Sequence, residues 1–243
     1  MGASRLTPVR TLPSRGVWWA TERVSGFGER HRIGWLTYHP LQLLSYHRAA
    51  SADAPAMVRA LREVLPDAHR YADVGAGGGA LAAELQRRGA QVQLCEHALG
   101  GRLLARAAGL RSRRLDLSRS PPSRLDGPFD VVCCFEVAEH LDERLGDRLV
   151  AYLSELAPTI VFTAAHPGQG GRGHVNERAQ AYWIERFARC GADHRDDLSR
   201  HIAEAFRRQG VEASWYGDNV MAFESRPVPR GAGDVAGYAG APA

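Results

Sequence analysis

Three side chains suited to acid–base chemistry or to metal binding follow one apolar segment of the chain. The segment is Phe129–Phe135, and Glu136, Glu139 and His140 come directly after it. If a helix begins at Glu136, the spacing i, i+3, i+4 places the three side chains on one helix face. Two carboxylates and an imidazole are suitable ligands for a divalent ion. Without a metal, Glu136 or His140 could instead serve as a general base.

Two further histidines lie in a glycine-rich loop after the next apolar segment, Thr159–Ala164. The loop has the sequence HPGQGGRGHVNE and contains His166 and His174. Its four glycines and one of the chain's two asparagines indicate a backbone that is selected for its shape. His166 and His174 are therefore candidate general bases that face the substrate, and the alternative is that they are merely exposed.

An earlier segment has the features of a ligand-binding turn. The short apolar stretch that contains Asp73 runs into Gly75-Ala-Gly77-Gly-Gly79. Glycines allow the backbone to turn tightly and to approach a ligand closely. The free N–H groups at the start of the following helix favour an anionic group. The segment also fits the dinucleotide-binding pattern G-x-G-x-x-[GA], although such turns also occur without a ligand.

Two acidic residues extend this site toward an adenosine-containing ligand. Glu96 ends the next predicted strand and lies 19 residues after Gly77, a distance at which an acidic residue accepts hydrogen bonds from ribose hydroxyls. Asp116 follows a third short strand and could accept a hydrogen bond from an adenine amino group. The alternatives are an exposed surface glutamate and an aspartate that caps a loop.

Alternating strands and helices are expected to position these residues. Strands are predicted at 71–74, 92–95, up to 115, 129–135 and 159–164, and helices at 52–65, 80–88, 100–108, 142–156, 178–190 and 196–209. This alternation predicts an α/β fold with a mostly parallel sheet, and ligands bind at the carboxyl ends of such strands. Two closing strands, Val211–Trp215 and Val220–Phe223, are separated by a tight turn and should be antiparallel neighbours.

The composition excludes several kinds of chemistry. The chain has 243 residues, and all 31 of its basic residues are arginine, which leaves no lysine for a Schiff base or a Walker-type phosphate loop. The sequence has no apolar stretch of about 20 residues, so no membrane span is predicted, and no secretory signal is evident. The four cysteines lack disulfide or metal-site spacing, which favours a reducing cytoplasm. The mild net charge of +4 permits a nucleic-acid partner without favouring one.

Three segments together resemble the class I S-adenosylmethionine-dependent methyltransferases. YADVGAGGGALAAELQRRGAQVQLCE is similar to their first motif, FDVVCCFEVAEHL to their post-strand motif, and VEASWYGDNVMAF to their terminal hairpin. The resemblance covers about residues 65–225. It implies a Rossmann-like fold whose seven-stranded sheet has one antiparallel strand. It also implies methyl transfer from S-adenosylmethionine, with cofactor-binding residues at Asp73, Gly75, Gly77, Gly79, Glu96, His97, Asp116 and Leu117.

The E-x-x-E-H pattern resembles two subgroups of this family, which act on the 3′ end of small RNAs or in ubiquinone biosynthesis. In both, the motif can bind a metal together with a further histidine from the loop after the fifth strand. The resemblance therefore implies a metal site, such as a Mg²⁺ site, at Glu136, Glu139, His140 and His174. In other relatives the same residues cap the helix without a metal.

The leading functional hypothesis is a methyltransferase that acts on O or N of a small molecule, such as a secondary metabolite of a bacterium. One alternative is an RNA 2′-O-methyltransferase with a divalent metal, and another is an NAD(P)-dependent oxidoreductase. The predicted organisation is a disordered N-terminus (1–15), a cap or substrate arm (16–65), the methyltransferase domain (66–225) and a flexible tail (226–243). The arm is rich in aromatic residues and histidine, and it either closes over the substrate or packs on the core. The sequence gives no oligomeric state.

Overall fold

The structure, a computed structural model, describes residues 40–119 and 125–225. The aromatic residues and histidines of the predicted arm that precede Pro40 therefore lie outside the described residues, as do the predicted N-terminus and tail. None of the described helices is long and apolar enough to cross a membrane.

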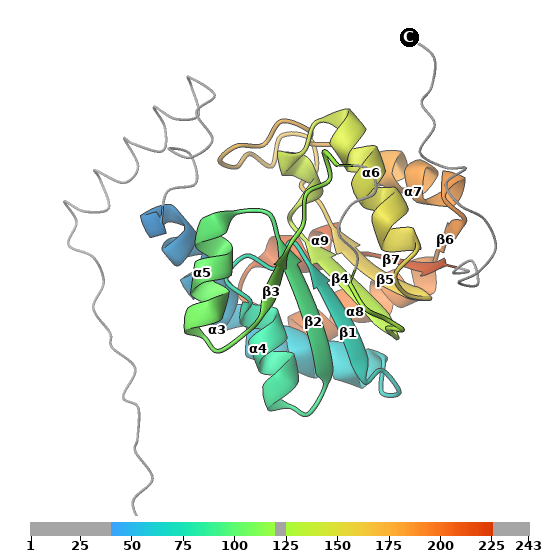
Figure 1. The fold of residues 1–243 in the computed structure, drawn as a ribbon. Helices are drawn as coiled ribbons and strands as arrows, with labels where there is room; N and C mark the ends of the chain where they lie inside the picture. The colour runs from blue at the N-terminus through green and yellow to red at the C-terminus, as the bar shows by residue number, and fades with distance from the viewer. Residues whose placement is uncertain (1–39, 120–124, 226–243) are drawn as a thin grey trace, which may run out of the picture.

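A seven-stranded sheet forms the centre of the described chain (Figure 1). Its strands are β1 (Arg70–Val74), β2 (Gln91–Glu96), β3 (Ser112–Arg114), β4 (Val131–Phe135), β5 (Thr159–Thr163), β6 (Ala192–His194) and β7 (Met221–Ser225). Their order across the sheet is β3-β2-β1-β4-β5-β7-β6. Only β7 runs against its neighbours β5 and β6, whereas the pairs among β1 to β5 are parallel. The predicted fold class is confirmed.

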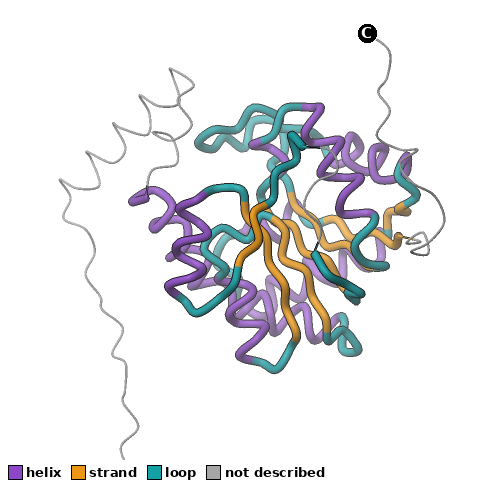
Figure 2. The backbone as a smooth tube through the Cα atoms, in the orientation of Figure 1, coloured by secondary structure: helices purple, strands orange, loops and turns teal. Residues whose placement is uncertain are grey.

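Helices cover both faces of the sheet (Figure 2). They are α3 (Pro40–Val64), α4 (Ala80–Arg87), α5 (Leu99–Ala107), the short 3₁₀ helix η1 (Ala138–His140), α6 (Glu143–Ser154), α7 (Gln180–Arg189), α8 (Asp196–Gln209) and α9 (Ser214–Asn219). Apolar residues of α3, α4 and α8 pack together against one face, and those of α6 and α7 pack against the other. The chain is thus a three-layer α/β structure.

Successive residues of β4 belong to different halves of this core. Cys133 packs on the side of α3 and α8, and Cys134 packs on the side of α6 and α7. Both are completely buried. The arrangement follows from the pleat of a strand, in which neighbouring side chains point to opposite faces.

The predicted closing hairpin is wrong in its first strand. Residues 211–215 form no strand, and the antiparallel partner of β7 is β6, which precedes α8 in the chain. The buried carboxylate of Asp53 on α3 explains the difference. It accepts hydrogen bonds from the backbone N–H groups of Glu212 at 2.7 Å and Ala213 at 3.2 Å. Because these N–H groups donate to a side chain, they are not available for pairing with a neighbouring strand. The chain continues into α9 instead.

Candidate active site

The glycine loop follows β1 and has the backbone conformation that glycine favours. Gly75, Gly77 and Gly79 have φ angles of 75°, 53° and 77°. A Cβ atom at Gly75 would lie 2.4 Å from a methyl carbon of Val137, which belongs to the segment after β4. Gly75 is therefore required both by its φ angle and by this close approach. The loop and the E-x-x-E-H segment touch at this point.

Asp73 is buried at the end of β1, next to the glycine loop. It is 4% exposed, and its Oδ2 atom has no hydrogen-bond partner among the described residues. Burial, with a contribution from the carboxylate of Glu96, raises the pKa of Asp73 to about 7, and a backbone hydrogen bond from Ala82 partly opposes this. A buried carboxyl oxygen without a partner fits a ligand that brings a positive charge or a donor group.

Glu96 connects the glycine loop to the end of β2. One carboxylate oxygen accepts the backbone N–H of Gly77 at 2.8 Å, and the other accepts that of Ala98 at 2.6 Å. A carboxylate has about four acceptor positions, so lone pairs remain for ribose hydroxyls. The neighbouring His97 donates through Nδ1 to the backbone carbonyl of Leu115 at 2.9 Å, which ties the ends of β2 and β3 together.

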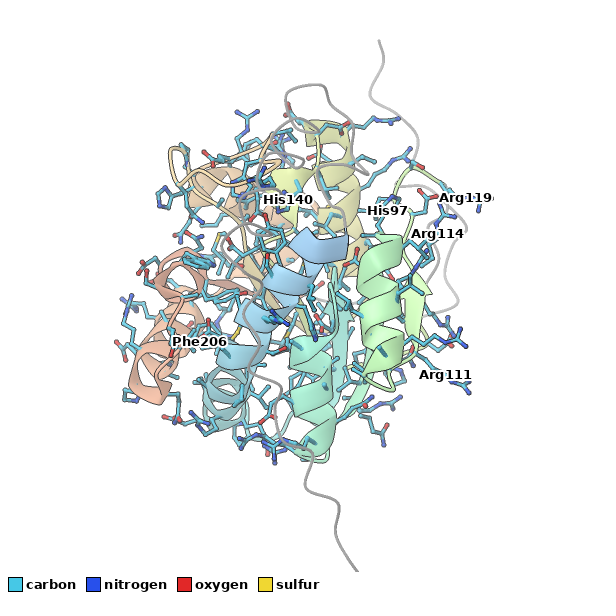
Figure 3. The ribbon with its side chains drawn as sticks, turned by 90° about the vertical axis from the view of Figure 1, so that its left-hand side faces the viewer. His97, Arg111, Arg114, Arg119, His140 and Phe206 are labelled. Atoms are coloured by element: carbon cyan, nitrogen blue, oxygen red, sulfur yellow. The ribbon has the colours of Figure 1, made fainter. Side chains whose placement is uncertain are left out.

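Asp116 and Leu117 lie just after β3, as predicted. The Asp116 carboxylate accepts the hydroxyl of Ser118 at 2.6 Å and lies 3.2 Å from a guanidinium nitrogen of Arg114. The Ser118 hydrogen bonds and then the Arg114 charge lower the pKa of Asp116, so it is an ionised acceptor at neutral pH. Leu117 is buried. Figure 3 shows His97 at one end of α5 and Arg114 along the neighbouring edge of the molecule.

The predicted cluster after β4 is only partly assembled. Ligand-type atoms of Glu139, His140 and His174 all lie within 4.8 Å of one another. Glu136 is not in this group, and the prediction of one helix face is wrong. Glu136 has a φ angle of 54°, in the left-handed region, and only Ala138–His140 form a short 3₁₀ turn. The positive φ interrupts the helical path, so the three side chains do not share one helix face.

Backbone hydrogen bonds bring His174 to this cluster from the distant loop. The carbonyl of Glu139 accepts the N–H groups of Val175 at 2.8 Å and Asn176 at 3.0 Å. His140 Nδ1 also lies 3.3 Å from the carbonyl oxygen of Gly173. The rings of His140 and His174 consequently meet edge to face with their centroids 4.9 Å apart.

Glu139 is the buried member of the cluster, and His140 and His174 are partly buried. Glu139 is completely buried, and neither carboxyl oxygen has a hydrogen-bond donor among the described residues. Burial, and then the nearby Glu136 carboxylate, hold the pKa of Glu139 well above its ordinary value. Burial, and then His174, lower the pKa of His140 to about 4. A neutral imidazole beside an unpartnered carboxyl group is a donor set that fits a divalent cation.

Glu177 is a site residue that the sequence analysis missed. Its carboxylate accepts from the Nδ1 atom of His174 at 2.8 Å and from the backbone N–H groups of Gly168 at 2.9 Å and Gly170 at 2.8 Å. It therefore shapes the glycine-rich loop and orients the His174 ring. A carboxylate three residues after a histidine was the available signal. His166 is exposed in the same loop and does not belong to the cluster.

Glu136 faces a second polar group. Its two carboxylate oxygens lie 3.4 Å from the side-chain amide nitrogens of Asn219 and Gln169. Asn219 also donates to the side-chain oxygen of Gln169 at 2.8 Å. Tyr216 is half-buried close by and stacks edge to face on Phe135. Both residues lie in the segment that resembles the family's terminal hairpin, but the sequence analysis placed them in a turn and gave them no role in the site.

Comparison with known proteins agrees with this geometry. Residues 72–157 match a family model described as a methyltransferase domain. No curated protein sequence matches the chain. The comparisons favour neither the RNA nor the oxidoreductase alternative, and the E-x-x-E-H subgroup stays a prediction.

Solved structures share the fold at low sequence identity. DesVI from Streptomyces venezuelae aligns with a TM-score of 0.56 and 16% identity over 76% of this chain and 97% of its own. CalS10 from Micromonospora echinaspora is an amino pentose methyltransferase of calicheamicin biosynthesis. It aligns with a TM-score of 0.55 and 18% identity over 78% of this chain and 98% of its own. The sugar N-methyltransferase KedS8 from a Streptoalloteichus species aligns with a TM-score of 0.55 and 15% identity over 73% of this chain and 88% of its own.

Proposed function

We propose that this chain is a class I S-adenosylmethionine-dependent methyltransferase that methylates an oxygen or nitrogen atom of a small molecule. The observation that carries the proposal is the position of the His174–Glu177 pair. It lies beside Glu139 and His140, in the loop after β5, and the segment that carries Glu139 contacts the cofactor-type loop after β1 through Val137 and Gly75. A site of this kind can bind a donor and an acceptor and can also accept a proton.

S-adenosylmethionine would supply an activated methyl group, and the residues after β1, β2 and β3 would hold it. Asp73 and the glycine loop suit its amino-acid end, Glu96 its ribose, and Asp116 with Leu117 its adenine. The support is the unpartnered oxygen of Asp73, the lone pairs left on Glu96 and the ionised state of Asp116. His97 belongs to this site as the residue that ties two of the binding loops together.

His174 is the proposed general base. The bond between its Nδ1 atom and Glu177 fixes the tautomer and leaves Nε2 to accept the proton of the acceptor. The carboxylate also stabilises the imidazolium that forms, as in other carboxylate–histidine pairs. His140, which burial keeps neutral at physiological pH, and Glu136 remain secondary candidates, and His166 is the least favoured because it is exposed and outside the cluster.

The same cluster supports a second role, that of a divalent-metal site. Glu139, His140 and His174 would be the ligands, whereas Glu136 stands outside the group. Two imidazoles and one carboxylate suit Mn²⁺, Fe²⁺ or Zn²⁺ better than Mg²⁺, which prefers oxygen ligands. Dialysis against a chelator, followed by metal analysis and an activity assay, separates the two roles. Full activity in metal-free protein would remove the metal role.

A small-molecule acceptor in secondary metabolism is supported by the neighbours, two of which are described as methyltransferases of a sugar or amino pentose. The four free cysteines support a reducing compartment such as the cytoplasm. The test is incubation with methyl-labelled S-adenosylmethionine and a panel of amino sugars and hydroxylated metabolites, analysed by mass spectrometry. Labelling of an amine or hydroxyl that His174→Ala reduces by about 100-fold supports the proposal.

The RNA alternative has a separate readout. Salt-dependent binding to short RNAs, with label transferred to a ribose and to no small molecule, would refute the proposed acceptor class. Binding of NAD(P)H without binding of S-adenosylhomocysteine would refute methyl transfer itself. Calorimetry with S-adenosylhomocysteine and NAD(P)H decides between methyl transfer and the oxidoreductase alternative before any acceptor is known.

A further inference from the structure

The N-terminal turns of α3 lie directly against the glycine loop. A Cβ atom at Gly78 would lie 2.2 Å from Nδ1 of His47, and one at Gly100 would lie 2.4 Å from a methyl carbon of Leu43. Gly78 does not have a positive φ angle, so the imidazole and not the backbone conformation requires a glycine there. Figure 3 shows this end of α3 at the same end of the molecule as His97 and His140.

The His47 side chain is partly buried, and its two ring nitrogens are not equivalent. Its Nδ1 atom is buried and has no hydrogen-bond partner within residues 43–119 and 125–225. Burial lowers the pKa of His47, so its ring is neutral and can donate one N–H. Buried polar atoms are nearly always paired in folded proteins, and an exception at a binding loop indicates a missing partner.

The hydrogen bonds of the glycine loop indicate which group of the cofactor this partner is. The N–H groups of Gly75 and Ala76 donate to the carbonyl of Cys95, and that of Gly77 donates to the carboxylate of Glu96. The Glu96 side of the loop is therefore negative and repels an anion. Gly78 lies on the other side, where α4 begins, and a helix N-terminus attracts negative charge.

S-adenosylmethionine carries one anionic group, the carboxylate of its methionine part. We propose that His47 is a cofactor-binding residue that donates a hydrogen bond to this carboxylate across Gly78. The inference rests on the use of S-adenosylmethionine stated above. His47 lies outside the matched family segment, which begins at residue 72, and outside every motif of the sequence.

Binding of two ligands, one with and one without the amino-acid part that carries this carboxylate, tests the inference. S-adenosylhomocysteine has the amino-acid part, and 5′-methylthioadenosine lacks it but keeps the adenosine. His47→Leu removes the hydrogen bond and keeps most of the volume against Gly78. Calorimetry should show about tenfold weaker binding of S-adenosylhomocysteine and less than about twofold change for 5′-methylthioadenosine, as for loss of one charge-assisted hydrogen bond.

Arg48→Ala is the matched control, because Arg48 is exposed on the same helix. It should change neither affinity. Thermal unfolding shows whether each variant is folded, and His47→Gln, which keeps a donor, replaces the leucine variant if that one is unstable. The glutamine variant should then bind S-adenosylhomocysteine within about threefold of the unmodified protein.

Two results would overturn the role of His47. One is unchanged affinity of the leucine variant for S-adenosylhomocysteine, and the other is an equal loss for both ligands, which would indicate packing alone. If the glutamine variant is the one used, a loss of affinity for S-adenosylhomocysteine greater than about tenfold would overturn the role of His47. Failure of the unmodified protein to bind S-adenosylhomocysteine would overturn the cofactor assignment as well. Normal binding without methylation of any small molecule would overturn only the proposed acceptor.

Discussion

The buried carboxyl group of Asp73 should make the ligand-free protein less stable as the pH rises. Its pKa in the folded protein is about 7, compared with an ordinary value of 3.8. Between these values the folded protein holds a proton that the unfolded chain has lost. The free energy of unfolding therefore falls as the pH rises from about 4 to 7 and stays low above that. A difference of roughly three pKa units corresponds to about 4 kcal/mol as an upper bound.

Asp73→Asn removes this titration and preserves the shape of the side chain. At pH 8 the ligand-free variant should be more stable than the unmodified protein by up to about 4 kcal/mol, and at pH 5 by much less. Urea unfolding followed by circular dichroism at the two pH values measures both differences. The variant should also gain less stability from S-adenosylhomocysteine, because it has lost the charge that faces the cofactor.

Asp130→Asn is the control, because Asp130 lies just before β4 and its carboxylate binds the start of β1, the strand that carries Asp73. Asp130 accepts the backbone N–H groups of His69 at 2.7 Å and Arg70 at 2.8 Å, so its amide variant should be less stable at pH 8. The reasoning about Asp73 is refuted if Asp73→Asn is also less stable at pH 8. It is equally refuted if the variant keeps the full pH dependence, because the titrating group would then lie elsewhere.

Two further substitutions test single contacts. Glu177→Gln should lower kcat by about 10- to 100-fold with little change in KM, because His174 loses the carboxylate that orients it, and steady-state kinetics on the identified acceptor measures this. Asp53→Ala should cost about 1–3 kcal/mol of unfolding free energy in urea, because it leaves the N–H groups of residues 212 and 213 without their acceptor. An unchanged kcat of Glu177→Gln contradicts the first expectation, and an unchanged urea midpoint of Asp53→Ala contradicts the second.

The sequence predicts the features that depend on local pattern. Strand β4 is recognisable because the five consecutive apolar residues Val131–Phe135 are typical of a buried strand, and the glycine loop because positive φ angles restrict the residue type. The contribution of Asp53 could not be predicted, because the residues whose N–H groups it binds lie about 160 positions later. The positive φ angle of Glu136 is also invisible in sequence, since glutamate rarely adopts it.

The contact between Gly75 and Val137 explains why the two halves of the site must be considered together. Gly75 belongs to the loop that would hold the cofactor, and Val137 lies between Glu136 and the turn that carries Glu139. Any side chain at Gly75 would displace Val137, because the added carbon would lie 2.4 Å from a methyl group in the middle of this segment. Since the carbonyl of Glu139 also holds the loop of His174, a shift at Gly75 would reach the proposed base. The positions of the methyl donor and of the base are therefore mechanically coupled through one glycine.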